Sequence, residues 1–154
     1  MAARVPADEL AFAKSVLEAE AAAVAGLARS LGEPFQQAVG LIAACADSGG
    51  TVLVTGLGKS GHVGAKMSAS MASLGIPSHA VHPTEAVHGD LGRFRSSDTV
   101  IAISFSGETE EVVTLAGILR QDGLPIITIT GGTTGPATSL ERLATVALRL
   151  GITA

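Results

Sequence analysis

A glycine-rich segment that carries one lysine, Thr55-Gly56-Leu57-Gly58-Lys59-Ser60-Gly61, has the residue types of an anion-binding loop. Glycine lets the backbone turn tightly and approach a ligand closely, and the start of a following helix offers free amides and a partial positive charge to an anion. The spacing excludes a Walker A loop, which needs four residues between its first glycine and Gly-Lys-Ser. It matches the dinucleotide pattern Gly-x-Gly-x-x-Gly, but no acidic residue ends the next expected strand, so a single phosphorylated ligand is favoured over a nucleotide.

Three hydroxyl groups gather in a second segment, Ser104-Phe105-Ser106-Gly107-Glu108-Thr109-Glu110-Glu111. Hydroxyls and the free amides at the start of a helix together form a cradle for phosphate. The alternative is an ordinary helix cap, in which Ser106 or Thr109 satisfies amides and glutamates favour the first turn. The presence of another glycine-rich loop at a strand end favours the phosphate interpretation.

Two histidines and a glutamate occur in a third segment, His82-Pro83-Thr84-Glu85-Ala86-Val87-His88-Gly89-Asp90. Zinc-binding helices place two histidines four residues apart, so that both face one way. His82 and His88 are six residues apart and would diverge by about a third of a turn on a helix. We therefore do not expect a dedicated catalytic metal, and inhibitory or adventitious binding at His82 is the more plausible form of metal contact. His62 and His79 lie in no motif and are assigned surface or capping positions.

Strands and helices must alternate to position these segments. Short β-branched runs predict strands at 51–55, 78–81, 99–103, 126–129 and 146–150, and helices are expected at about 7–29, 34–47, 60–74, 108–121 and 139–143. This order predicts a three-layer, doubly wound α/β sandwich with a five-stranded parallel sheet, of the flavodoxin-like kind, preceded by two helices. Ligands bind beyond the carboxyl ends of such strands, and all three segments fall at those ends.

Composition excludes several classes of function. The chain has 154 residues, of which 47% are hydrophobic and 16% charged, and this suits one folded domain. It has no Trp or Tyr and a net charge of −4, which argue against a nucleic-acid partner. Cys45 is the only cysteine, so neither an internal disulfide nor a thiolate cluster is expected. No secretory signal or bilayer-length apolar run is found, and a cytoplasmic protein without a membrane partner is expected.

The three segments, in this order and spacing, resemble the sugar isomerase (SIS) domain, and more narrowly the bacterial arabinose-5-phosphate isomerases. Ser-x-Ser-Gly-x-Thr marks SIS domains broadly, whereas the histidine-rich segment, continued to Gly92, is much more specific to these isomerases. The resemblance covers nearly the whole chain. It implies interconversion of D-ribulose 5-phosphate and D-arabinose 5-phosphate, as a step toward Kdo and lipopolysaccharide, without an organic cofactor.

The resemblance also implies roles for individual residues. Lys59, His88 and Glu111 are the implied catalytic residues. An enediol route needs a base for the carbon-bound proton, a shuttle for the oxygen proton and stabilisation of the oxyanion. We assign these tasks, as a hypothesis, to Glu111, His88 and Lys59 in that order. The implied substrate-binding residues are Gly58, Ser60, Gly75, His82, His88, Ser104, Ser106, Gly107 and Thr109.

Three of these residues, Ser104, Ser106 and Thr109, are expected to hold the phosphate, and His82 is the position implied for inhibitory zinc. The segment at about 114–123 also matches positions of substrate or zinc contact in the family. Phe105 departs from the family, in which an Asn is common at this position.

The organisation expected from the resemblance is a single SIS domain over 1–154, with an α/β core at 51–150. We expect the helices within 1–47 to pack on, or exchange with, a partner subunit in a homodimer or homotetramer. The chain stops at Ala154, before the acidic residue, the helix and the further catalytic His of a His-Pro-Gly-Gly segment that family members carry, and before the CBS modules of many of them. We therefore expect a fragment of a longer isomerase or a shortened relative.

Two other functions compete with this expectation. The main alternative is a non-catalytic, sugar-phosphate-binding regulatory SIS module, which would keep the three phosphate-binding hydroxyls. Such a module has no need of Lys59, His88 and Glu111 together, and their joint presence favours the enzyme. An SIS isomerase that acts on hexulose or aminosugar phosphates is a third option.

Overall fold

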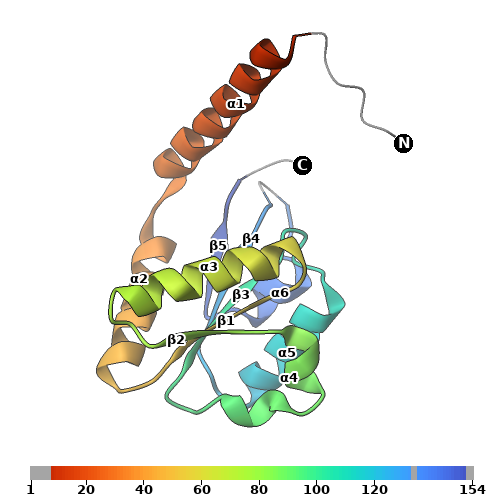
Figure 1. Cartoon of the computed structure of the whole chain (residues 1–154). Helices are drawn as coiled ribbons and strands as arrows, with labels where there is room; N and C mark the ends of the chain where they lie inside the picture. Colours follow the sequence, from red (N-terminus) through yellow and green to blue (C-terminus); the bar gives the residue numbers. More distant parts are fainter. Residues whose placement is uncertain (1–7, 133–134, 152–154) are drawn as a thin grey trace. The chain divides into compact units, whose positions relative to one another are not determined.

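The computed structural model describes residues 8–132 and 135–151, which divide into two compact units between Leu31 and Gly32 (Figure 1). The first unit is one helix, α1 (Glu9–Ser30), which begins where the Asp8 side chain accepts a hydrogen bond from the amide of Ala11 (2.9 Å). None of the residues of α1 is buried within the described chain, and large apolar side chains are exposed along it: Leu10, Phe12, Val16, Leu17 and Val24.

The first seven residues of the expected N-terminal region, 1–47, lie outside the described residues. The packing of this region on a partner subunit stays a prediction, as does its inclusion with the core in one domain.

The second unit is built on five parallel strands in the order β2-β1-β3-β4-β5. Their bounds are Val52–Gly56 for β1, Ser78–Val81 for β2, Thr99–Ile103 for β3, Ile126–Thr130 for β4 and Val146–Arg149 for β5. Each lies within one residue of the bounds expected from the sequence. The expected five-stranded parallel sheet is therefore confirmed.

Helices cover both faces of this sheet (Figure 1). Their bounds are Glu33–Asp47 for α2, Lys59–Ser73 for α3, Pro83–Val87 for α4, Glu110–Gln121 for α5 and Ser139–Leu143 for α6, with a 3-10 turn at Asp90–Arg93. α2 and α3 pack on one face, and α4, α5 and α6 pack on the other, so the three-layer sandwich is confirmed. Within the described ranges, no helix combines the length and apolarity that a bilayer crossing needs.

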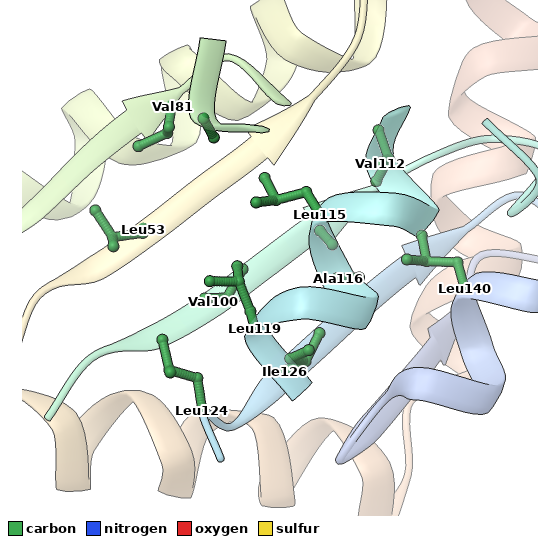
Figure 2. Packing of buried hydrophobic residues seen from close by; sticks show 12 residues of the cluster. Leu53, Val81, Val100, Val112, Leu115, Ala116, Leu119, Leu124, Ile126 and Leu140 are labelled. Carbon is green, nitrogen blue, oxygen red and sulfur yellow. The ribbon is translucent and has the colours of Figure 1, made fainter. Parts of the chain in front are cut away.

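Successive residues of each central strand supply the two apolar layers in turn, because side chains alternate across a pleated strand. In β1, Val52 and Val54 contact the α2–α3 layer, whereas Leu53 contacts the α4–α6 layer. All five residues of β1, and all five of β3, are buried. Figure 2 shows Leu115 and Leu119 of α5 facing the apolar residues of the strands. Burial on both faces explains why these strands are continuously apolar in the sequence.

The order of the strands reverses at β1. The helix that follows β1 lies on one face of the sheet, and the helix that follows the neighbouring β3 lies on the other. The loops after β1 and β3 therefore separate at the carboxyl ends of these strands, which is where ligands bind in folds of this class. Gly56 pairs with Ile103 at this edge, so both loops start side by side.

Candidate functional site

The loop after β1 is built on glycines that nothing larger can replace without strain. A Cβ on Gly56 would lie 3.0 Å from the carbonyl oxygen of Ile103, and a Cβ on Gly61 would lie 2.7 Å from the carbonyl oxygen of Gly56. Gly58 has a φ of 56°, in the left-handed region that favours glycine. α3 starts directly after it, and no side chain among the described residues caps that helix. The first turn of α3 is therefore available to an anion.

The loop after β3 is held by its own hydroxyls. The Ser104 side chain is buried, lies 2.8 Å from the Thr109 hydroxyl, and accepts a hydrogen bond from the amide of Gly107 (3.1 Å). Ser106 is exposed and accepts from the amide of Glu108 (3.2 Å). Of the three hydroxyls expected to hold phosphate, Ser104 thus shapes the turn from inside, and Ser106 stands at the surface.

The helix that follows this loop, α5, begins at Glu110, two residues later than expected. Thr109 is its N-cap residue, yet within the described chain no side chain makes a capping hydrogen bond there, because the Thr109 hydroxyl lies against Ser104 instead. The cap by Thr109 that the alternative interpretation allowed is therefore not found, whereas Ser106 does satisfy one amide, that of Glu108. The start of α5 is open to a ligand in the same way as the start of α3.

A pocket of about 450 Å³ opens beside the glycine loop, at the ends of β1 and β2. We call it the glycine-loop pocket; its lining residues are Val54, Gly56, Gly58, Gly61, His62, Ala80, Val81, His82 and Glu85. Two expected substrate-binding residues, Gly58 and His82, thus lie in one pocket. The sequence analysis missed His62 and Glu85. Their positions in the sequence could have indicated them, since His62 follows Gly61 directly and Glu85 lies inside the histidine-rich segment.

A second pocket, of about 220 Å³, lies between α4 and α5. We call it the α4–α5 pocket; its lining residues are Thr84, Val87, His88, Glu110, Glu111 and Thr114. Two of the three expected catalytic residues, His88 and Glu111, meet here. Thr114 opens the segment 114–123, the rest of which runs toward the far end of α5.

The remaining expected residues lie elsewhere. Lys59 and Ser60 form the first turn of α3 and belong to the lining of neither pocket in the described chain. Gly75 follows the other end of the same 15-residue helix, about 22 Å away along its axis. Its role in substrate binding stays a prediction that this chain alone does not support.

No three His, Cys, Asp or Glu side chains in residues 8–132 and 135–151 are grouped so as to hold a metal ion. A zinc ion at His82 would therefore need further ligands from the substrate, from water or from another chain, and inhibitory zinc there stays a prediction.

Two carboxyl groups beside the loop after β3 have altered proton affinity. Burial acts to raise the pKa of Glu141, but hydrogen bonds from Arg149, from Thr130 and from the Thr138 amide, with the Arg149 charge, outweigh it and leave that pKa lowered. Hydrogen bonds from the side chain and the amide of Ser139 lower the pKa of Glu108. Both groups are therefore ionised at neutral pH.

The chain matches the model of the SIS domain over residues 46–152, which include both pockets and both loops. This chain belongs to the SIS domain family. The SIS fold is also found in similar solved structures: a candidate phosphosugar isomerase of Bacteroides fragilis involved in capsule formation has a TM-score of 0.86, 33% identity and coverage of 94% of this chain and 74% of its own. A protein of Escherichia coli CFT073 in complex with arabinose 5-phosphate has a TM-score of 0.84, 33% identity and coverage of 94% and 73%.

Curated relatives of this SIS domain carry the name arabinose 5-phosphate isomerase KdsD. The protein from Pseudomonas aeruginosa is 42% identical over 129 residues, and the protein from Escherichia coli K12 is 44% identical over 135 residues. These matches cover 84% and 88% of this chain but 39% of each relative. The chain thus spans about two-fifths of the curated relatives, and the resemblance inferred from its motifs is confirmed.

The glycine loop yields a prediction about stability. Replacing Gly61 by Ala puts a methyl group 2.7 Å from the Gly56 carbonyl oxygen, so Gly61→Ala is expected to lower the free energy of unfolding by about 1–3 kcal/mol. The matched control is Gly117→Ala in α5, where a Cβ meets nothing within 4 Å. That change is expected to raise the free energy of unfolding by about 0.5–1 kcal/mol, because Ala favours a helix. Urea unfolding followed by circular dichroism measures both, and equal effects would contradict the steric argument.

The lowered pKa values of Glu108 and Glu141 yield a prediction about how stability depends on pH. A carboxylate whose pKa is lower in the folded chain stabilises the fold above its unfolded pKa, and this contribution is lost as the pH falls through the folded value. We expect the free energy of unfolding to decline below about pH 4.5, and to decline less in Glu141→Gln, which lacks one of the two groups. Thr128→Val, a buried change without a titratable group, should keep the wild-type decline. Urea unfolding at several pH values is the measurement, and an identical decline in Glu141→Gln would refute the assignment.

Proposed function

We propose that this chain is the SIS domain of an arabinose-5-phosphate isomerase, which interconverts D-arabinose 5-phosphate and D-ribulose 5-phosphate. The observation that carries the proposal is the α4–α5 pocket, in which His88 and Glu111 lie together next to the uncapped start of α5. Relatives named arabinose 5-phosphate isomerase KdsD and a similar structure in complex with arabinose 5-phosphate support the choice of substrate.

The proposed reaction moves one proton between two carbons of the open-chain sugar. The Glu111 carboxylate removes the proton from C2 of the aldose, an enediol forms, and the same proton or one from solvent is delivered to C1. His88 moves the hydroxyl proton from the oxygen at C2 to the oxygen at C1, a task that suits an imidazole near neutral pH. The charge of Lys59 at the start of α3 offsets the negative charge that develops on oxygen.

Binding of the phosphate is assigned to Ser106, Thr109 and the amides at the start of α5, with Ser104 shaping the turn. The glycine-loop pocket would take the hydroxyl-bearing part of the sugar. It combines backbone from Gly58 with the imidazoles of His62 and His82 and the carboxylate of Glu85, all of which bind hydroxyl groups.

The decisive experiment incubates the chain with arabinose 5-phosphate in deuterated water and follows label incorporation at C2 by NMR. Glu111→Gln is expected to slow exchange by about 10²–10⁴-fold, the usual contribution of a catalytic base. The matched control Glu33→Gln removes a carboxylate at the start of α2, on the other face of the sheet, and should leave exchange unchanged. Resonance shifts on adding the sugar phosphate, without any exchange, would instead favour the non-catalytic regulatory module.

We also propose a homodimer or homotetramer, a cytoplasmic location and a role in making the Kdo of lipopolysaccharide. The location is proposed from the sequence, and the role from the name KdsD that the relatives carry. The exposed apolar side chains of α1 support association, since that helix buries no residue within the described chain. Light scattering is expected to give a mass of two or four chains. A stable monomer at working concentration would rule out the association.

A further inference from the structure

We infer that α6 is a clamp that sets the loop 104–109 in its phosphate-binding conformation, and that Glu141 and Arg149 are positioning residues for it. They do not touch the anion but act through Thr138 and the start of α6. The inference rests on the proposed function only in taking this loop as the phosphate-binding element.

The first turn of α6 directs its amides at the loop. The amide of Ser139 donates to the carboxylate of Glu108 (2.8 Å), and the amide of Leu140 donates to the carbonyl oxygen of Gly107 (3.0 Å). Amides at the start of a helix have no partner inside the helix. Here they hold the segment 107–108 at two successive residues, so the loop cannot move away from α6 without losing both bonds.

Thr138 packs against the loop at its tightest point. Gly107 has a φ of 68°, and a Cβ at this position would collide with the Thr138 side chain. The Thr138 hydroxyl accepts a hydrogen bond from the amide of Glu141 (3.3 Å), and the Glu141 carboxylate accepts from the amide of Thr138 (3.0 Å). This reciprocal capping box fixes Thr138 in the position that Gly107 requires.

The carboxylate of Glu141 is the centre of the clamp. Its side chain is 3% exposed and accepts hydrogen bonds from the Thr130 hydroxyl (2.6 Å) at the end of β4 and from the Arg149 guanidinium (2.6 and 3.0 Å) at the end of β5. A buried carboxylate that is bonded from several directions has one low-energy position. The hydrogen bonds of Glu141 therefore hold the start of α6 at a defined place relative to the ends of β4 and β5. The start of α6 in turn holds the loop.

A second attachment holds the loop from β4. The carbonyl oxygen of Phe105 accepts a hydrogen bond from the amide of Gly131 (2.9 Å), and the Phe105 ring fills the space that a Cβ on Gly131 would occupy. The loop is thus fixed at Phe105, Gly107 and Glu108, whereas Ser106 between them stays exposed. When a loop is already ordered before the ligand arrives, no binding free energy is lost to ordering the loop.

It follows that the clamp affects phosphate binding and not the proton transfer assigned to His88 and Glu111. His88 and Glu111 are positioned by α4 and α5. In the described chain α6 touches α5 through apolar packing at Leu140, but none of the hydrogen bonds of the clamp runs to either helix. Loosening the clamp is therefore expected to weaken phosphate binding and to raise KM, while kcat stays within about twofold of wild type.

Thr138→Val tests the inference, because it removes the capping hydroxyl and keeps the size of the side chain. Titration of inorganic phosphate by NMR is expected to give a dissociation constant about tenfold higher than wild type, the change that one lost capping interaction produces. Thr138→Ser, which keeps the hydroxyl, should stay within about threefold of wild type. The matched control is Thr128→Val, because the hydroxyl of Thr128 is buried in β4 without a partner among the described residues.

A second variant guards against loss of folding. Replacing Glu141 and Arg149 together by Met exchanges the ion pair for apolar contacts, which proteins often tolerate without loss of stability. The double variant lacks the bond to the Thr138 amide, and we again expect phosphate affinity to fall about tenfold or more while the melting transition is retained.

The outcomes separate the clamp from the proposed function. Wild-type phosphate affinity in folded Thr138→Val and in the folded double variant would overturn the clamp, even if arabinose 5-phosphate is isomerised. Failure of the wild-type chain to bind phosphate would overturn it as well. Weakened phosphate binding in both variants supports the clamp, even if the wild type shows no exchange at C2 and the proposed function fails.

Discussion

The pairing of β1 with β3 is the constraint on which the rest of the structure depends. These strands are buried on both faces, and the helices that follow them lie on opposite sides of the sheet. Because Gly56 pairs with Ile103 at the carboxyl edge, the glycine loop and the serine-rich loop begin side by side and then part. Two helix starts without side-chain caps, those of α3 and α5, lie at the same edge of the sheet as a result.

The short helix α4 explains how one segment serves two pockets. His82 is its N-cap residue and lines the glycine-loop pocket, whereas His88 is its C-cap residue and lines the α4–α5 pocket. Between them, Thr84 and Val87 lie three residues apart on one side of the helix, and Glu85 lies on another. The six-residue spacing that argued against a shared metal site therefore separates the two histidines between neighbouring pockets.

The sequence was sufficient to predict the sheet, because continuous β-branched runs such as 99–103 have few other interpretations. It did not predict α4, since five residues that begin with a proline carry no helical period. It placed the start of α5 two residues early, because it could not foresee that the Thr109 hydroxyl would turn to Ser104.

The candidate site was predicted only as far as its motifs extend. His88 and Glu111 were named from the resemblance, and the structure brings them into one pocket. His62 and Glu85 were missed because their place in a pocket depends on how β1 and β2 lie together. The ion pair of Glu141 and Arg149 joins two different elements and leaves no local pattern, so only the folded chain reveals it.

The position of α4 has a mechanical consequence. The helix is a common wall, with Glu85 on the side of one pocket and Val87 on the side of the other, and Pro83 and Ala86 anchor it in the core. A displacement of this wall that widens one pocket narrows its neighbour. Two ligands that each moved this wall would therefore be thermodynamically linked through the same five residues.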